Sequence, residues 1–181
     1  CDDYPLEQYY RDARIHPIHE GTTAIHGMDL LGRKVMIQNG RAFSLFVNEI
    51  EDTLSRAREI SDLVKYAQSL KNASEKLQNV TQHLLSLAQT GGPEPFLADA
   101  TLYLELFGIT AIAWQWLLQG LSAQRAMDKG CKKSDTRFYE GKMYTLRYFY
   151  AYELPKIKGL TERLLDDDRV TVEMESGFFN D

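Results

Sequence analysis

A heptad repeat of apolar residues occupies the middle of the chain, from residue 63 to residue 88. Apolar side chains recur every seven positions in two interleaved sets: Leu63, Leu70, Leu77 and Leu84, and Tyr66, Ala73, Val80 and Leu87. In an α-helix this spacing places both sets along one stripe, which packs well against a second helix at a shallow crossing angle. The repeat therefore predicts a chain built from helices packed on helices.

The prolines leave room for long helices, because proline ends or kinks a helix. No proline occurs in the 75 residues between Pro17 and Pro93 or in the 59 residues between Pro95 and Pro155. The run Thr-Gly-Gly-Pro at residues 90–93 predicts the end of the heptad helix. Glycine can adopt the left-handed cap conformation there, and proline cannot continue the helix.

Three further segments complete the predicted helices. Residues 43–64 carry apolar side chains at steps of three and four, the period of one helix face, and another helix should begin near Glu94. A polar turn at residues 128–135 offers Ser134 or Asp135 as the N-cap of the last helix. The predicted core face of that helix, with tyrosines at its margin, consists of Phe138, Met143, Leu146, Phe149, Leu154 and Ile157.

Residues 106–124 contain no charged side chain, and this length of 19 residues approaches that of a membrane span. Five polar residues interrupt the stretch: Thr110, Gln115, Gln119, Ser122 and Gln124. They favour a central bundle helix that is apolar on most sides, so no stable membrane insertion is expected.

The chain is thus expected to be all-α, an up-and-down bundle of about four long helices preceded by a shorter helical segment. Residues 1–38 form the shorter segment, with a break at residues 15–21. Residues 39–165 form the bundle and residues 166–181 an acidic tail, in which residues 169–174 are the only strand-like run. A chain of 181 residues can bury a core without disulfide bonds, so its two cysteines need no structural role.

The negative charge is confined to the tail. Residues 165–181 contain six acidic side chains and one basic one, which accounts for the whole net charge of −5. The remainder of the chain holds 20 acidic and 20 basic residues. A nucleic-acid binder would normally carry a basic excess to neutralise phosphates, so no nucleic-acid partner is expected.

The beginning of the chain predicts an intracellular protein. It starts with Cys1 and shows no charged segment followed by an apolar stretch, so no signal peptide is predicted. The chain has the character of a segment of a longer or processed protein. A reducing, cytoplasmic location is the default expectation.

Potential ligands cluster near the N-terminus: His16, His19, Glu20, His26 and Asp29. Pro17 disfavours a regular helical pair of the first two histidines, so no metal site is predicted. A second interpretation places Glu20 just before a helix that Thr22 or Thr23 caps. Backbone N–H groups at that helix start could bind phosphate or another anion, or Glu20 could simply stabilise the helix.

Three ordered motifs in this region resemble the C-terminal end of the flavin-dependent acyl-CoA dehydrogenases. They are YYRDARI at residues 9–15, IHEGT at residues 18–22 and DLLGRK at residues 29–34. Residues 94–107 and 137–155 are similar to the additional C-terminal helical domain of the long subgroup of that family. That subgroup includes enzymes that act on methylthio-substituted and other short or unusual acyl-CoA thioesters.

The resemblance implies an active site and a cofactor. In the family the glutamate of the EGT motif removes the α-proton of the acyl thioester while the β-hydrogen leaves as hydride to flavin, so Glu20 is expected to be the catalytic base. Its backbone N–H helps to stabilise the developing enolate oxygen. Gly21 and Thr22 match residues that lie against FAD. The implied partners are an acyl-CoA substrate, an electron-transfer acceptor and further copies of the chain in a dimer or tetramer.

Two positions depart from the family pattern. His19 stands where many members have tyrosine, and Ala24 where several have a side chain that reaches the adenine end of the flavin. The family also uses an N-terminal helical domain and a β-domain, so these 181 residues alone are expected neither to hold FAD tightly nor to oxidise acyl-CoA. The alternatives are a helical oligomerisation or interaction module without catalytic activity, and an acyl-carrying or membrane-associated helical protein.

Overall fold

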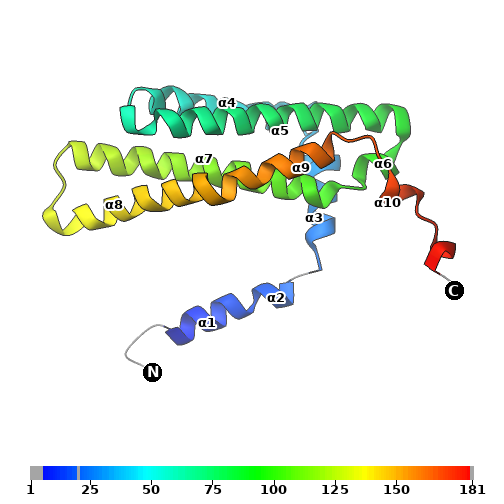
Figure 1. Cartoon of the computed structure of the whole chain (residues 1–181), viewed down its shortest axis with the longest axis horizontal. Coiled ribbons are helices and arrows are strands. Elements are labelled where there is room, and N and C mark those ends of the chain that lie inside the picture. The colour runs from blue at the N-terminus through cyan, green and yellow to red at the C-terminus, as the bar shows by residue number, and fades with distance from the viewer. Residues whose placement is uncertain (1–5, 20, 180–181) are drawn as a thin grey trace.

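The computed structural model describes residues 6–19 and 21–179, and these residues are mostly helical with no strand among them. Four long helices follow one another along the chain: α4 (Arg41–Arg58), α5 (Val64–Gly91), α7 (Ala100–Asp128) and α8 (Lys133–Tyr148). The last continues through the π-helical turn η3 (Phe149–Glu153) and the 3-10 turn η4 (Leu154–Lys156) into α9 (Ile157–Leu164). The hairpin of α4 and α5 packs on the hairpin of α7 with α8 and α9 (Figure 1), which confirms the all-α bundle.

Shorter helical pieces flank the bundle and connect its parts. They are α1 (Leu6–Arg14), α2 (His16–His19), α3 (Thr23–Asp29), η1 (Leu30–Lys34), η2 (Ser61–Leu63), α6 (Pro93–Leu97), α10 (Val170–Glu173) and η5 (Ser176–Phe179). In Figure 1, α1 and α2 extend away from the bundle, whereas α3 reaches it and contacts α7. The predicted break at residues 15–21 is therefore partly wrong, because α2 occupies residues 16–19 of it.

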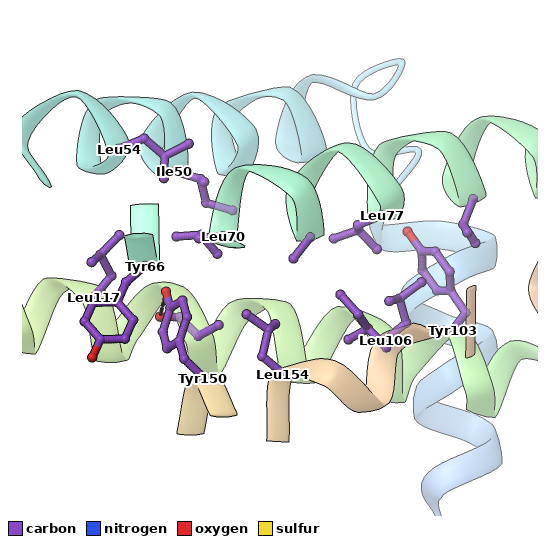
Figure 2. Close-up of a cluster of buried hydrophobic side chains, with 14 of the residues drawn as sticks. Ile50, Leu54, Tyr66, Leu70, Leu77, Tyr103, Leu106, Leu117, Tyr150 and Leu154 are labelled. Atoms are coloured by element: carbon purple, nitrogen blue, oxygen red, sulfur yellow. Dashed lines mark hydrogen bonds between the residues drawn. The ribbon is translucent and has the colours of Figure 1, made fainter. Parts of the chain in front are cut away.

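The heptad stripe of α5 forms the centre of the core. Leu70 and Val80 are fully buried, and every residue of the two predicted sets is buried except the half-buried Leu87. Figure 2 shows the buried leucines of α5 together with Ile50 of α4 and Leu106 of α7. Helix α5 thus contacts both α4 and α7, as a shared a/d stripe predicts.

The boundary between the first two long helices was predicted incorrectly. Helix α4 ends at Arg58, and Ile60 has extended backbone angles of φ −114° and ψ 113°. The chain reverses direction here, so Val64 starts α5 and is 45% exposed instead of facing the core. The periodic spacing continues across the turn by coincidence, and periodicity alone does not reveal a reversal.

The last long helix corrects two predictions. It begins at Lys133, with Lys132 at the N-cap position, and the Ser134 hydroxyl donates to the Asp135 carboxylate at 2.8 Å instead of capping the helix. Phe138 is 59% exposed, since the tip of the α7–α8 hairpin extends past the end of the α4–α5 hairpin (Figure 1). Tyr150 is buried because the π-helical turn η3 changes the register of the helix face.

The strand-like run in the tail forms the short helix α10 instead. Its backbone is satisfied locally: the Glu173 N–H donates to the Arg169 carbonyl at 2.9 Å, and the Val170 N–H donates to the Asp168 carboxylate at 3.0 Å. A strand would need a neighbouring strand, and the part of the chain that the structure describes contains none.

The uncharged stretch lies in α7, which contacts α3, α4, α5, α8 and α9. Among the described residues, Pro93–Asp128 is the one helical stretch that is long and apolar enough to cross a membrane by length and composition. Its contacts are those of the central bundle helix that the sequence predicts. The absence of membrane insertion stays a prediction.

A buried hydroxyl pair joins α5 to α7. Tyr103 is fully buried, and its hydroxyl lies 2.7 Å from Thr81 Oγ1, which itself donates to the Leu77 carbonyl at 2.7 Å. Either hydroxyl of this pair can be the donor. Burial raises the pKa of Tyr103 to about 12, and the hydrogen bond to Thr81 partly opposes this rise.

The free energy of unfolding should therefore fall as the pH rises from about 10 toward about 12. Below about pH 10 the tyrosine is protonated in both the folded and the unfolded state. Between about pH 10 and about pH 12 only the unfolded chain loses the proton, and this lowers the free energy of unfolding by about 3 kcal/mol. Tyr103→Phe should remove this part of the decline, whereas Tyr144→Phe, at a 70% exposed position, should not. Urea denaturation at about pH 9 and about pH 11.5 measures the difference. Equal pH dependence in wild type and Tyr103→Phe would contradict the prediction.

Candidate active site

The EGT motif lies in the link between α2 and α3. Glu20 itself lies outside the described residues, between His19 at the end of α2 and Gly21. Gly21 has a φ of +104°, a conformation that residues with a Cβ rarely adopt. No atom of the described residues lies within 4 Å of the position that a Cβ on Gly21 would occupy. The backbone therefore favours glycine at this position, and the space beside it is open.

The residue after Gly21 begins the next helix. Thr22 is the N-cap residue of α3, with φ −103° and ψ −2°, and its carbonyl accepts a hydrogen bond from the His26 N–H at 2.9 Å. Helix α3 continues into η1 and ends at Lys34, as the sequence predicts. Gly21 and Thr22 are both exposed, so their backbone is accessible to a group placed against the link.

Asp29 is engaged by two cations one turn further along the segment. Arg33 Nε donates to Asp29 Oδ1 at 2.5 Å and Arg33 Nη2 to Oδ2 at 2.9 Å, while Lys34 Nζ lies 3.3 Å from Oδ2. The hydrogen bond from Arg33 is the main reason that the pKa of Asp29 is lowered, and it also raises the pKa of Arg33. The carboxylate is thus held as an anion in an ion pair within the DLLGRK motif.

The structure adds no metal site to this segment. Within residues 6–19 and 21–179 no group of three or more histidine, cysteine, aspartate or glutamate side chains is placed to hold a metal ion. Glu20 lies outside that range. Asp29 is also committed to Arg33, so it offers no free carboxylate beside His26.

A glycine that the sequence analysis did not single out joins the segment to the bundle. Gly27 is buried where α3 meets α7, and a Cβ there would lie 2.5 Å from the carbonyl oxygen of Ala100. On the same side of the segment Leu31 and Val35 are buried in the core. An isolated glycine inside a helical pattern often has a packing reason, and that signal could have identified Gly27.

The N-terminal segment also exposes many large apolar side chains. They are Leu6, Tyr9, Tyr10, Ile15, Ile18, Ile25 and Met28. The main cavities of the described chain are lined by residues from Leu30 onward, and none of them includes the EGT link. The described residues of this segment therefore offer one wall for a group placed against the link. The open space at Gly21 fits a flat group lying against the backbone, but this chain does not enclose such a group.

Comparison with known proteins relates the bundle and the N-terminal segment to acyl-CoA dehydrogenases. Residues 46–175 match the family described as acetyl-CoA dehydrogenase C-terminal like. The chain is 36% identical over 166 residues to the 3-methylmercaptopropionyl-CoA dehydrogenase of Ruegeria pomeroyi. The aligned region covers 89% of this chain and 27% of that protein.

Two other dehydrogenases are more distant but match almost all of the chain. The broad-specificity linear acyl-CoA dehydrogenase FadE5 of Mycobacterium tuberculosis is 27% identical over 183 residues, which is 98% of this chain and 30% of that protein. A butyryl-CoA dehydrogenase of Syntrophomonas wolfei is 22% identical over 173 residues, 95% of this chain and 28% of that protein. The chain thus spans less than a third of the length of these relatives.

Proposed function

Since the chain belongs to the acetyl-CoA dehydrogenase C-terminal-like family, we propose that it is the C-terminal part of a flavin-dependent acyl-CoA dehydrogenase. The whole protein would introduce a double bond between the α and β carbons of an acyl-CoA thioester. The observation that carries this proposal is the extent of the similarity to FadE5. It spans 98% of the chain and so includes the EGT link, which lies outside the matched residues 46–175.

In this proposal Glu20 is the base of the reaction. Its carboxylate would accept the α-proton of the thioester, and the backbone N–H of the same residue would donate to the thioester oxygen as negative charge develops on it. A bound flavin would supply the acceptor for the hydride that leaves the β-carbon. Gly21 and Thr22 would lie against that flavin, a role that their exposure and the open space beside Gly21 support.

The other half of the site would come from a different part of the protein. Wrapping a flavin requires contacts on several sides, whereas every residue of α1 is exposed and Gly21 lies beside open space. The exposed apolar side chains of this segment are suited to being covered by further protein.

The purified 181-residue chain is expected to contain no stoichiometric flavin, for the reason just given. The visible absorbance of oxidised flavin, compared with the protein concentration, measures this. The full-length protein, prepared in parallel, serves as the control and should be yellow. A stoichiometric flavin band in the 181-residue chain would overturn the view that it forms only one wall.

A second candidate function is a helical interaction module without activity of its own. It is favoured by the bundle, because residues 46–175 match a domain that excludes the EGT link. The two proposals make different predictions for substitution of Glu20, which are given below. We further propose an electron-transfer acceptor, a dimeric or tetrameric assembly, a cytoplasmic location and no nucleic-acid partner, on the basis of the family resemblance and the charge distribution.

A further inference from the structure

A groove of about 660 Å³ lies between the start of α5 and the end of α8. Its lining comes from residues 61–68 and 143–147 and includes no residue of the N-terminal segment. It is thus separate from the EGT link. Its volume lies within the range of about 300–1,000 Å³ that is typical of sites for small molecules.

Two cations line this groove without a carboxylate partner. In the described parts of the chain neither Lys65 nor Arg147 forms an ion pair, although the Lys65 ammonium lies 4.8 Å from the centroid of the Tyr66 ring. Asp62 is the acidic residue of the groove, and it pairs with neither of them. The lining therefore carries a net charge of +1 in a protein whose net charge is −5.

A tyrosine hydroxyl without a protein partner also belongs to this groove. Tyr66 is 8% exposed and lines the groove, and its ring meets Tyr150 edge to face at a centroid distance of 5.2 Å. The two rings lie next to one another at one end of the core (Figure 2). Within residues 6–19 and 21–179 the Tyr66 hydroxyl has no hydrogen-bond partner, whereas the Tyr150 hydroxyl donates to the Ala113 carbonyl at 2.9 Å. Among the described residues the only buried side-chain N or O atom without a partner is His83 Nε2, so the Tyr66 hydroxyl is accessible to solvent or to a ligand in the groove.

We propose that this groove binds a phosphorylated small molecule with a planar aromatic body, of about nucleotide size. Arg147 and Lys65 contact the phosphate, since charge-assisted hydrogen bonds from guanidinium and ammonium groups are the strong ones. The Tyr66 hydroxyl donates to the same group. Tyr144, which is 70% exposed, and Met143 pack against the aromatic body. This site goes beyond the dehydrogenase function and does not depend on Glu20.

Binding of adenosine monophosphate to the 181-residue chain, measured by calorimetry, tests the proposal. Saturable binding is expected to weaken as salt is added, because the contact is electrostatic. Arg147→Gln should weaken it about tenfold or more, and Tyr66→Phe should weaken it several-fold. Inorganic phosphate and adenosine, each used alone, should bind at least about tenfold more weakly than the nucleotide, since each makes only part of the contacts.

The matched control is Arg137→Gln, which changes an exposed arginine of the same helix that does not line the groove. The affinity of this variant for adenosine monophosphate should stay within about twofold of wild type. Equal midpoint temperatures of thermal unfolding in wild type and variants show that the fold is kept. The proposal is overturned if the nucleotide does not bind, if Arg147→Gln and Arg137→Gln bind it equally well, or if inorganic phosphate binds as tightly as the nucleotide.

Discussion

Replacing Glu20 with glutamine in the full-length protein is expected to slow flavin reduction by acyl-CoA about 10²–10⁴-fold, the usual contribution of a positioned general base. Glutamine has nearly the shape of glutamate, but its amide cannot accept the α-proton. The backbone N–H of residue 20 is unchanged, so substrate binding should change far less than the rate. Anaerobic mixing of enzyme and substrate, followed through the loss of flavin absorbance, measures the rate of the reductive step directly.

A control at Glu7 separates loss of the base from general loss of charge. Glu7 lies on α1 and forms an exposed ion pair with Arg11, so Glu7→Gln should leave the rate within about twofold of wild type. Flavin content and unfolding midpoint should be the same in both variants. If Glu20→Gln reduces flavin as fast as wild type, Glu20 is not the base, and the interaction-module proposal is favoured.

Replacing Gly27 with alanine is expected to lower the free energy of unfolding by about 2–3 kcal/mol, within the range for overpacked core positions. The new methyl group would lie 2.5 Å from the carbonyl oxygen of Ala100 and 2.8 Å from its carbonyl carbon. Both are backbone atoms at the start of α7 and cannot rotate away. Helix α3 must therefore move outward, which loosens the packing of Leu31. Urea denaturation of the 181-residue chain measures the change.

Gly32→Ala is the matched control, because Gly32 lies in the same segment. A Cβ there would lie 3.5 Å from Leu97 Cδ2, an ordinary van der Waals distance. Alanine is the better helix former by up to about 1 kcal/mol, so this variant should be as stable as wild type or slightly more stable. Equal stability of the two variants would mean that α3 does not pack on α7 as described. Hydrogen exchange of residues 23–35 should also be faster only in Gly27→Ala.

The displacement of α3 also bears on the proposed site. Gly21 and Thr22 are held at the start of α3, and α3 is held by Gly27 and Leu31. A shift of that helix would move the EGT link relative to the rest of the enzyme. Small misplacements of a catalytic group cost large factors in rate, so Gly27→Ala should slow the full-length enzyme while Gly32→Ala should not.

Local patterns in the sequence predicted the long helices and singled out the N-terminal segment for its motifs. The heptad of α5 predicted its buried stripe because side chains seven residues apart lie on one side of a helix. Gly91 and Gly92 marked the end of α5, since Gly92 adopts a φ of +82°. The EGT link was recognised because its residues are contiguous. The structure shows Gly21 and Thr22 exposed, and their contact with a cofactor stays a prediction.

The features that the sequence did not predict depend on contacts between distant residues. The reversal at residues 59–63 has no periodic signature, and the register change that buries Tyr150 arises in a π-helical turn. Phe138 is exposed because the tip of its hairpin has no helix over it (Figure 1). Each depends on where a neighbouring element ends, which local periodicity does not encode.

The sequence by itself determined the all-α class, the buried stripe of α5, the acidic tail and the family resemblance, because all of these are carried by residue spacing and order. Only the tertiary structure decided that Gly27 brings α3 against Ala100, that Thr81 satisfies Tyr103, and that Lys65, Tyr66 and Arg147 line one groove. The partners are separated by 22 positions for Thr81 and Tyr103, by 73 for Gly27 and Ala100 and by 82 for Lys65 and Arg147, and a single sequence has no periodic signal at such distances. Their proximity follows from how the two hairpins pack on one another and how α3 packs on α7.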